Sequence, residues 1–136
     1  LPIVIVGTLA IEMFIVFRFG GVPRKALTLA IGAASIIVSN LISYVLPYIL
    51  DAMHAVSLYG IDRSEALSWS VSKGPFYIIM PMSLILTIIC EYPIVYFSMR
   101  WAVKDRKALI WAIIIANVIT TASVALMERM LVKGSW

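Results

Sequence analysis

Long apolar runs separated by short polar segments are the main pattern of this chain. Four runs are long enough to cross a membrane as helices, because the hydrocarbon core requires about 20 helical residues. None of them shows the strict alternation of a membrane-spanning strand. The pattern therefore predicts an all-α integral membrane protein with four transmembrane helices, at about 1–19, 26–50, 76–99 and 109–127.

Two parts of the chain resemble each other. The sequence RKALxxAI occurs at 24–31 and again at 106–113, and upstream of each copy lies a glutamate, Glu12 or Glu91, followed by isoleucine and valine at the same spacing. Both glutamates fall on helices that run in the same direction across the membrane, so the repeats should be parallel and not inverted. We predict one membrane domain, 1–136, made of two parallel-repeat helical hairpins. Repeat 1 covers about 1–50, an outer loop covers 51–75, and repeat 2 covers about 76–136.

The outer loop should contain a short amphipathic helix. Asp62 and Glu65 have the spacing of a capping box, which predicts a helix at about 62–73. Its apolar residues, Leu67 among them, would rest on the membrane surface while its charged residues stay in water. The helix either closes the bundle or docks a partner, and the sequence leaves both interpretations open.

Composition agrees with a lipid-embedded chain. Of the 136 residues, 62% are hydrophobic and 13% are charged, and the mean hydropathy is +1.02. Soluble domains carry about 25% charged residues. The net charge of +4 does not indicate nucleic-acid binding, because the basic residues lie between the apolar runs.

The basic residues predict the orientation. Seven of the eleven flank the first and third connections, which should therefore be cytoplasmic. Both termini would then lie outside, and we expect a prokaryotic cytoplasmic membrane. The chain begins at Leu1 on the outer side, which fits a removed signal peptide as well as a sequence taken from a longer chain. The seven residues are Arg18, Arg24, Lys25, Arg100, Lys104, Arg106 and Lys107.

Glu12 and Glu91 are the candidate functional residues, because an acid within the membrane is costly and needs a partner or a function. Polar residues of the returning helices fall at similar depth, and Pro93 should kink the helix that carries Glu91. One interpretation is hydrogen-bonded glue between helices. Proton or cation handling and contact with a larger complex are the alternatives. The predicted network or ion path comprises Glu12, Glu91, Ser35, Ser39, Asn40, Asn117, Thr120 and Thr121.

Most catalytic chemistry is excluded by residue counts and motifs. His54 is the single histidine and Cys90 the single cysteine, so neither a three-histidine zinc site nor a bis-histidine haem site fits within the chain. We expect no cofactor and no enzymatic activity. The sequence favours a small non-catalytic subunit that packs onto, or stabilises, a larger integral membrane complex. The alternative is a small oligomeric proton- or cation-conducting or transporter module using Glu12 and Glu91. The expected partners are lipid and either other membrane subunits or copies of this chain.

Overall fold

The computed structural model describes residues 2–72 and 80–131, and within them the regular secondary structure consists of helices alone. This confirms the predicted all-α class. The helices are α1 (Pro2–Phe19), α2 (Ala26–Tyr59), α3 (Arg63–Ser72), α4 (Met80–Met99) and α5 (Arg106–Leu131).

The helix boundaries follow from backbone chemistry more than from charge. The sequence prediction ended the second helix at Leu50, before the first charged residue, but α2 continues to Tyr59. It ends where Gly60 adopts a left-handed φ of 65° and donates its N–H to the carbonyl of Val56 at 3.0 Å. Only glycine adopts this conformation without steric cost. The short outer helix lies where it was predicted: it begins at Arg63, one residue later than expected, and is described as far as Ser72.

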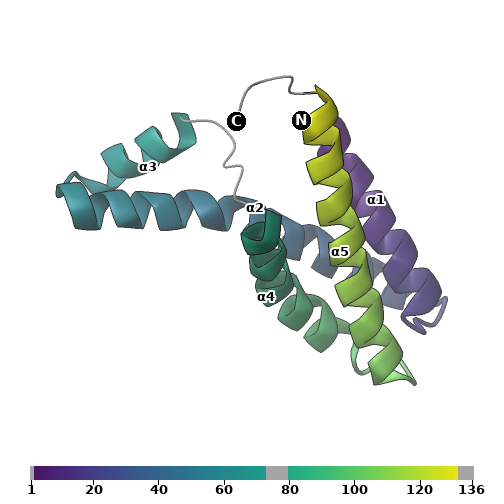
Figure 1. Cartoon of the computed structure of the whole chain (residues 1–136). Coiled ribbons are helices and arrows are strands. Elements are labelled where there is room, and N and C mark those ends of the chain that lie inside the picture. Colours follow the sequence, from purple (N-terminus) through teal and green to yellow (C-terminus); the bar gives the residue numbers. More distant parts are fainter. Residues whose placement is uncertain (1, 73–79, 132–136) are drawn as a thin grey trace.

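Four of the helices form a ring. Helix α1 packs against α2 and α5, and α4 packs against the same two helices, whereas α1 and α4 do not contact each other in the described residues (Figure 1). The C-terminal half of α2 extends away from the ring and carries α3 along its side. We call this projection, residues 51–72, the arm. The connections α1–α2 and α4–α5 lie at the same end of the ring.

Small side chains allow close approach at two places. A Cβ atom on Gly32 of α2 would lie 2.7 Å from the ring of Phe17 and 2.8 Å from the Met99 methyl group. In the arm, Ala55 and Ala66 are buried between α2 and α3. Such contacts are how helices gain dispersion energy in lipid, where no hydrophobic effect drives them together.

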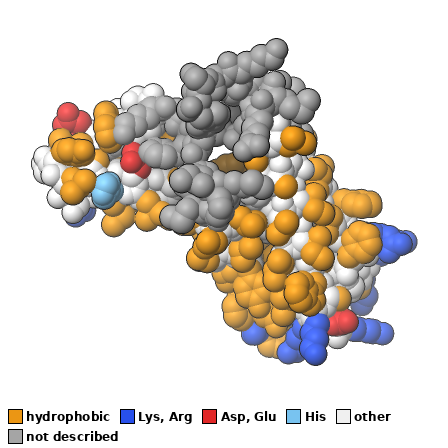
Figure 2. All heavy atoms as spheres, viewed as in Figure 1, with side chains coloured by type: hydrophobic (Ala, Val, Ile, Leu, Met, Phe, Trp, Pro, Cys, Tyr) orange, Lys and Arg blue, Asp and Glu red, His pale blue; other side chains and the backbone are white. Residues whose placement is uncertain are grey.

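The ring buries polar side chains beside an apolar core cluster, and its outer surface is also apolar. Large apolar side chains are exposed along the helices and cover the visible face of the ring (Figure 2). Buried side chains include two acids and several amides and hydroxyls. A soluble monomer seldom exposes a continuous apolar surface of this kind. The buried polar residues are Thr8, Glu12, Ser35, Ser39, Asn40, Ser43, Ser70, Glu91, Asn117 and Thr120.

Among the described residues, two helices are long and apolar enough to cross a membrane: α2, over Ala26–Tyr59, and α5, over Arg106–Leu126. Only 33% of the most apolar window of each is buried, whereas the core helix of a soluble protein is mostly buried. The described side chains of α4 form a shorter apolar segment, Leu84–Met99. The structure thus supports two of the four predicted spans, and the count of four stays a prediction.

Candidate functional site

Glu12 is the first of two acids at the centre of the ring. It lies on α1, and only 3% of its surface is exposed. One carboxyl oxygen accepts a hydrogen bond from the side-chain amide of Asn40 on α2. The other accepts one from the Thr120 hydroxyl of α5 at 3.0 Å. A single carboxyl group therefore joins α1 to both of its neighbours.

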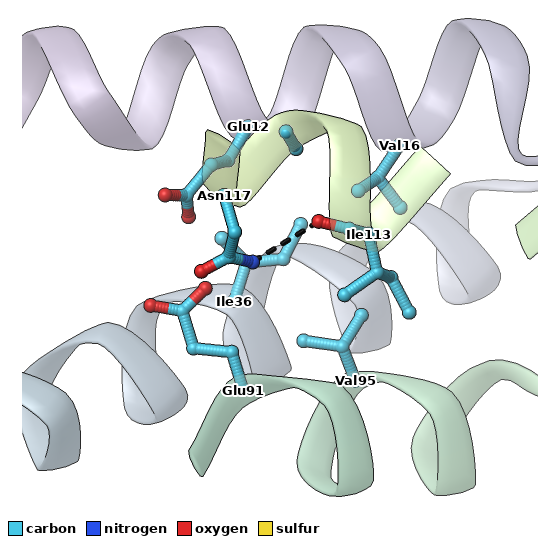
Figure 3. A pocket seen from close by; sticks show the side chains of 8 residues that line it. Glu12, Val16, Ile36, Glu91, Val95, Ile113 and Asn117 are labelled. Atoms are coloured by element: carbon cyan, nitrogen blue, oxygen red, sulfur yellow. Dashed lines mark hydrogen bonds between the residues drawn. The ribbon is translucent and has the colours of Figure 1, made fainter. Parts of the chain in front are cut away.

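Glu91 makes the equivalent connections from α4. It is also 3% exposed, and its Oε1 lies 3.4 Å from the donating hydroxyl of Ser43 on α2. Its carboxyl group also hydrogen-bonds the side chain of Asn117 on α5. The Asn117 amide nitrogen donates to the carbonyl of Ile113 at 3.1 Å, which turns the amide oxygen toward Glu91 (Figure 3).

The two carboxyl groups border one small cavity between the helices (Figure 3). Its volume is about 10 Å³, which is room for about one water molecule. No basic side chain lines it, so two ionised carboxylates would face each other without a counter-charge. The site can therefore share protons, hold a water, or hold a small cation. The remaining lining residues are Val16, Ile36, Val95, Ile113, Ala116 and Asn117.

Five of the predicted polar residues meet at this site: Glu12, Asn40, Glu91, Asn117 and Thr120. Of these, the spacing argument had placed Glu12, Glu91 and Asn117 at similar depth. We call these five residues together with Ser43 the central polar cluster.

Four other predicted residues lie elsewhere. Ser35 and Ser39 are buried, but their hydroxyls donate to carbonyls of their own helix, of Gly32 at 2.9 Å and of Ile36 at 3.0 Å. Thr121 is half-buried, and its side chain has no hydrogen bond to the described residues. Pro93 lies within α4, which is helical on both sides of it.

Three residues near the cluster were missed. Ser43 lies three residues after Asn40, and thus on the same face of α2; this spacing could have identified it. Thr8 lies one helical turn before Glu12, and its hydroxyl is 3.4 Å from the Tyr44 hydroxyl. No sequence argument singled out Thr8 or Tyr44.

The outer helix begins as predicted, with a different set of hydrogen bonds. Asp62 Oδ2 accepts from the backbone N–H of Ser64 at 3.0 Å and from its hydroxyl. These bonds hold the pKa of Asp62 below its usual value. No reciprocal bond from Glu65 completes the capping box among the described residues. Of the predicted apolar face, Leu67 and Val71 are exposed while Ala66 is buried against α2.

No group of three His, Cys, Asp or Glu side chains suited to a metal ion lies in the described part of the chain. Comparisons with protein-family models, with curated proteins and with solved structures found no match to this chain. Function is therefore inferred from the geometry of the cluster, the ring surface and the arm.

Proposed function

We propose that this chain is a small, non-catalytic, multi-pass membrane subunit that packs onto a larger integral membrane complex and stabilises it. The observation that carries the proposal is the apolar outer surface of the ring around a buried polar cluster. Its polar side chains are used inside, in bonds between helices, and its outer surface is apolar. Such a ring presents helix faces for other membrane helices and no reaction machinery.

Four membrane-spanning helices are part of this proposal. At a rise of 1.5 Å per residue, the 18 residues of α1 and the 20 of α4 extend about 27 and 30 Å. A hydrocarbon core is about 30 Å thick. Helices α1 and α4 occupy opposite positions in the ring, as do α2 and α5, which supports the two parallel hairpins. Loops one and three, which carry seven basic residues, would face the cytoplasm of a prokaryote, with both termini outside.

The arm supplies the element that a larger complex would contact. It extends beyond the ring, and it exposes apolar side chains on both of its helices. Leu58 is 60% exposed and Tyr59 69% exposed at the end of α2, and Val71 is 59% exposed on α3. These side chains would lie at the membrane surface, where a partner subunit can cover them.

Purification of the full chain in mild detergent tests the proposal. Native mass spectrometry should give a complex of fixed stoichiometry that contains other gene products. Leu67→Ser, in the exposed face of α3, should weaken that complex, whereas Ser68→Ala on the same exposed helix should not. Recovery of the chain only as a monomer, or only as a symmetric oligomer, contradicts the subunit assignment.

The small cavity favours a second candidate function. It lies between two carboxyl groups and is lined by no basic residue, which is the setting of a proton or cation site. In this version the chain is an oligomeric conducting module, since four helices alone rarely enclose a pathway. Proton or sodium flux into vesicles that contain the pure protein is the deciding assay. Flux that Glu91→Gln abolishes supports conduction, and flux equal to that of empty vesicles excludes it for this chain acting alone.

A further inference from the structure

The end of the ring that carries loops one and three bears positive charge with almost no compensation (Figure 2). Seven basic residues lie there with one acid, Asp105. That acid is already used, because its Oδ1 accepts the backbone N–H groups of Lys107 at 2.9 Å and Ala108 at 3.1 Å and thereby caps α5. None of the described residues forms an ion pair with these cations, so the end presents an electropositive surface.

Arg100 differs from the other six cations of this end. They are exposed, whereas Arg100 is half-buried at the end of α4, and its Nε is enclosed without a hydrogen-bond partner. Its guanidinium carbon lies 4.7 Å from the Phe97 ring centre and 4.5 Å from that of Trp101. Two rings thus hold the planar group in place. A loop that only sets topology by its charge does not require such positioning.

We propose that this end of the ring binds the phosphate group of an anionic phospholipid, with Arg100 as its fixed contact. A held guanidinium suits phosphate, which it can bind through two parallel hydrogen bonds. The side chains of Phe97 and Trp101 are 54% and 77% exposed, and they extend the apolar surface of the ring as far as the Arg100 guanidinium. The guanidinium therefore lies where acyl chains give way to headgroups, which favours a lipid over an acidic protein. This inference rests on the membrane embedding of the proposed function and not on the existence of a complex.

Binding of short-chain lipids to the full chain in neutral detergent tests the inference. Both lipids carry the phosphate, but the choline ammonium of phosphatidylcholine cancels its charge next to the guanidinium, so phosphatidylglycerol should bind at least about fivefold more tightly, the effect expected for about one basic contact. Arg100→Ala should remove most of this preference. Arg100→Lys, which keeps the charge but loses the planar group, should recover only part of it. Arg63→Ala, a cation of α3 outside this end, is the matched control and should leave the preference unchanged.

Several outcomes would overturn the lipid assignment. Equal affinity for the two lipids would do so, as would full preference in a folded Arg100→Ala variant. Displacement of the lipid by inorganic phosphate alone, or tighter binding of a poly-glutamate peptide, would assign the site to another ligand. Circular dichroism establishes that each variant is folded, and Arg100→Lys provides the test if Arg100→Ala does not fold. Loss of the lipid preference with an intact larger complex refutes this inference and leaves the subunit proposal standing. Loss of the larger complex with the lipid preference retained refutes the subunit proposal and leaves this inference standing.

Discussion

Replacing Glu12 separates structural bonding from charge at the centre of the ring. Glutamine retains one acceptor oxygen and gains an amide donor, so it can accept from Asn40 and donate to the Thr120 hydroxyl. Both links between helices then survive, in the pattern that a protonated glutamate would make. Leucine has a similar size but can make neither bond. If Glu12 acts as interhelical glue, glutamine should therefore be tolerated and leucine should not.

The size of the effect follows from the number of bonds. Glu12→Leu removes two hydrogen bonds between helices, and each contributes about 0.6 to 2 kcal/mol in membrane proteins. When Glu12 is absent, Asn40 and Thr120 can still donate to nearby carbonyls of their own helices, so neither is left without an acceptor. We therefore expect a loss of about 1–4 kcal/mol for Glu12→Leu. For Glu12→Gln we expect a change within about 0.5 kcal/mol.

Reversible unfolding in mixed detergent micelles, followed by circular dichroism, measures these differences. Ser123→Ala is the matched control, because this exposed hydroxyl of α5 bonds only a carbonyl of its own helix, and its loss should change stability by less than about 0.5 kcal/mol. If Glu12→Gln destabilised the protein as much as Glu12→Leu, hydrogen bonding would not be the role of this side chain. The negative charge, or a cation bound to it, would then be required.

Three further predictions follow. In a Cys90→Ala background, cysteines introduced by Gly21→Cys and Lys104→Cys should resist membrane-impermeant thiol reagents in intact cells, while Ser57→Cys should react; the opposite pattern contradicts the orientation. The lowered pKa of Asp62 means that its cap stabilises α3 at pH values above its ordinary pKa and is lost as the pH falls through the lowered value. The protection factors of the α3 amides, which correct for the intrinsic exchange rate at each pH, should therefore fall in acid, and Asp62→Asn should remove that response; a wild-type response equal to that of the variant contradicts the cap. An experimental structure should superpose α1 on α4 and α2 on α5 about an axis along the membrane normal, and an axis in the membrane plane would refute the repeat.

The helices were largely predictable because their ends depend on local chemistry. Runs of apolar residues bounded by glycine, proline and charge placed α1 and the start of α2 within a residue or two, and the spacing of Asp62 and Glu65 did the same for the start of α3. The end of α2 was missed because Asp51 was taken as the start of a loop. A charged residue alone does not stop a helix, whereas Gly60 in the left-handed region does.

The depth of the site residues along their helices was predictable, but the direction in which their side chains point was not. Counting residues from the basic motif placed Asn117 and Ser35 at equal depth, but it could not show which faces of their helices meet. Asn117 contacts Glu91, while the Ser35 hydroxyl bonds its own helix. Ser43 was missed although it lies only one turn beyond Asn40. Such contacts depend on helix rotation and crossing angle, which are set by packing between elements distant in the sequence.

The geometry also explains why one buried acid would not be enough to link all four helices of the ring. Glu12 links α1 to α2 and α5, which leaves α4 held by apolar packing alone if Glu91 is absent. Glu91 supplies the missing links, from α4 to the same two helices. Because lipid provides no hydrophobic force to press helices together, each acid on its own would connect only three of the four helices. Two acids on opposite helices are the smallest set that joins every adjacent pair, although their partners are different residue types. The repetition of the acid, more than that of its partners, is therefore what the ring requires.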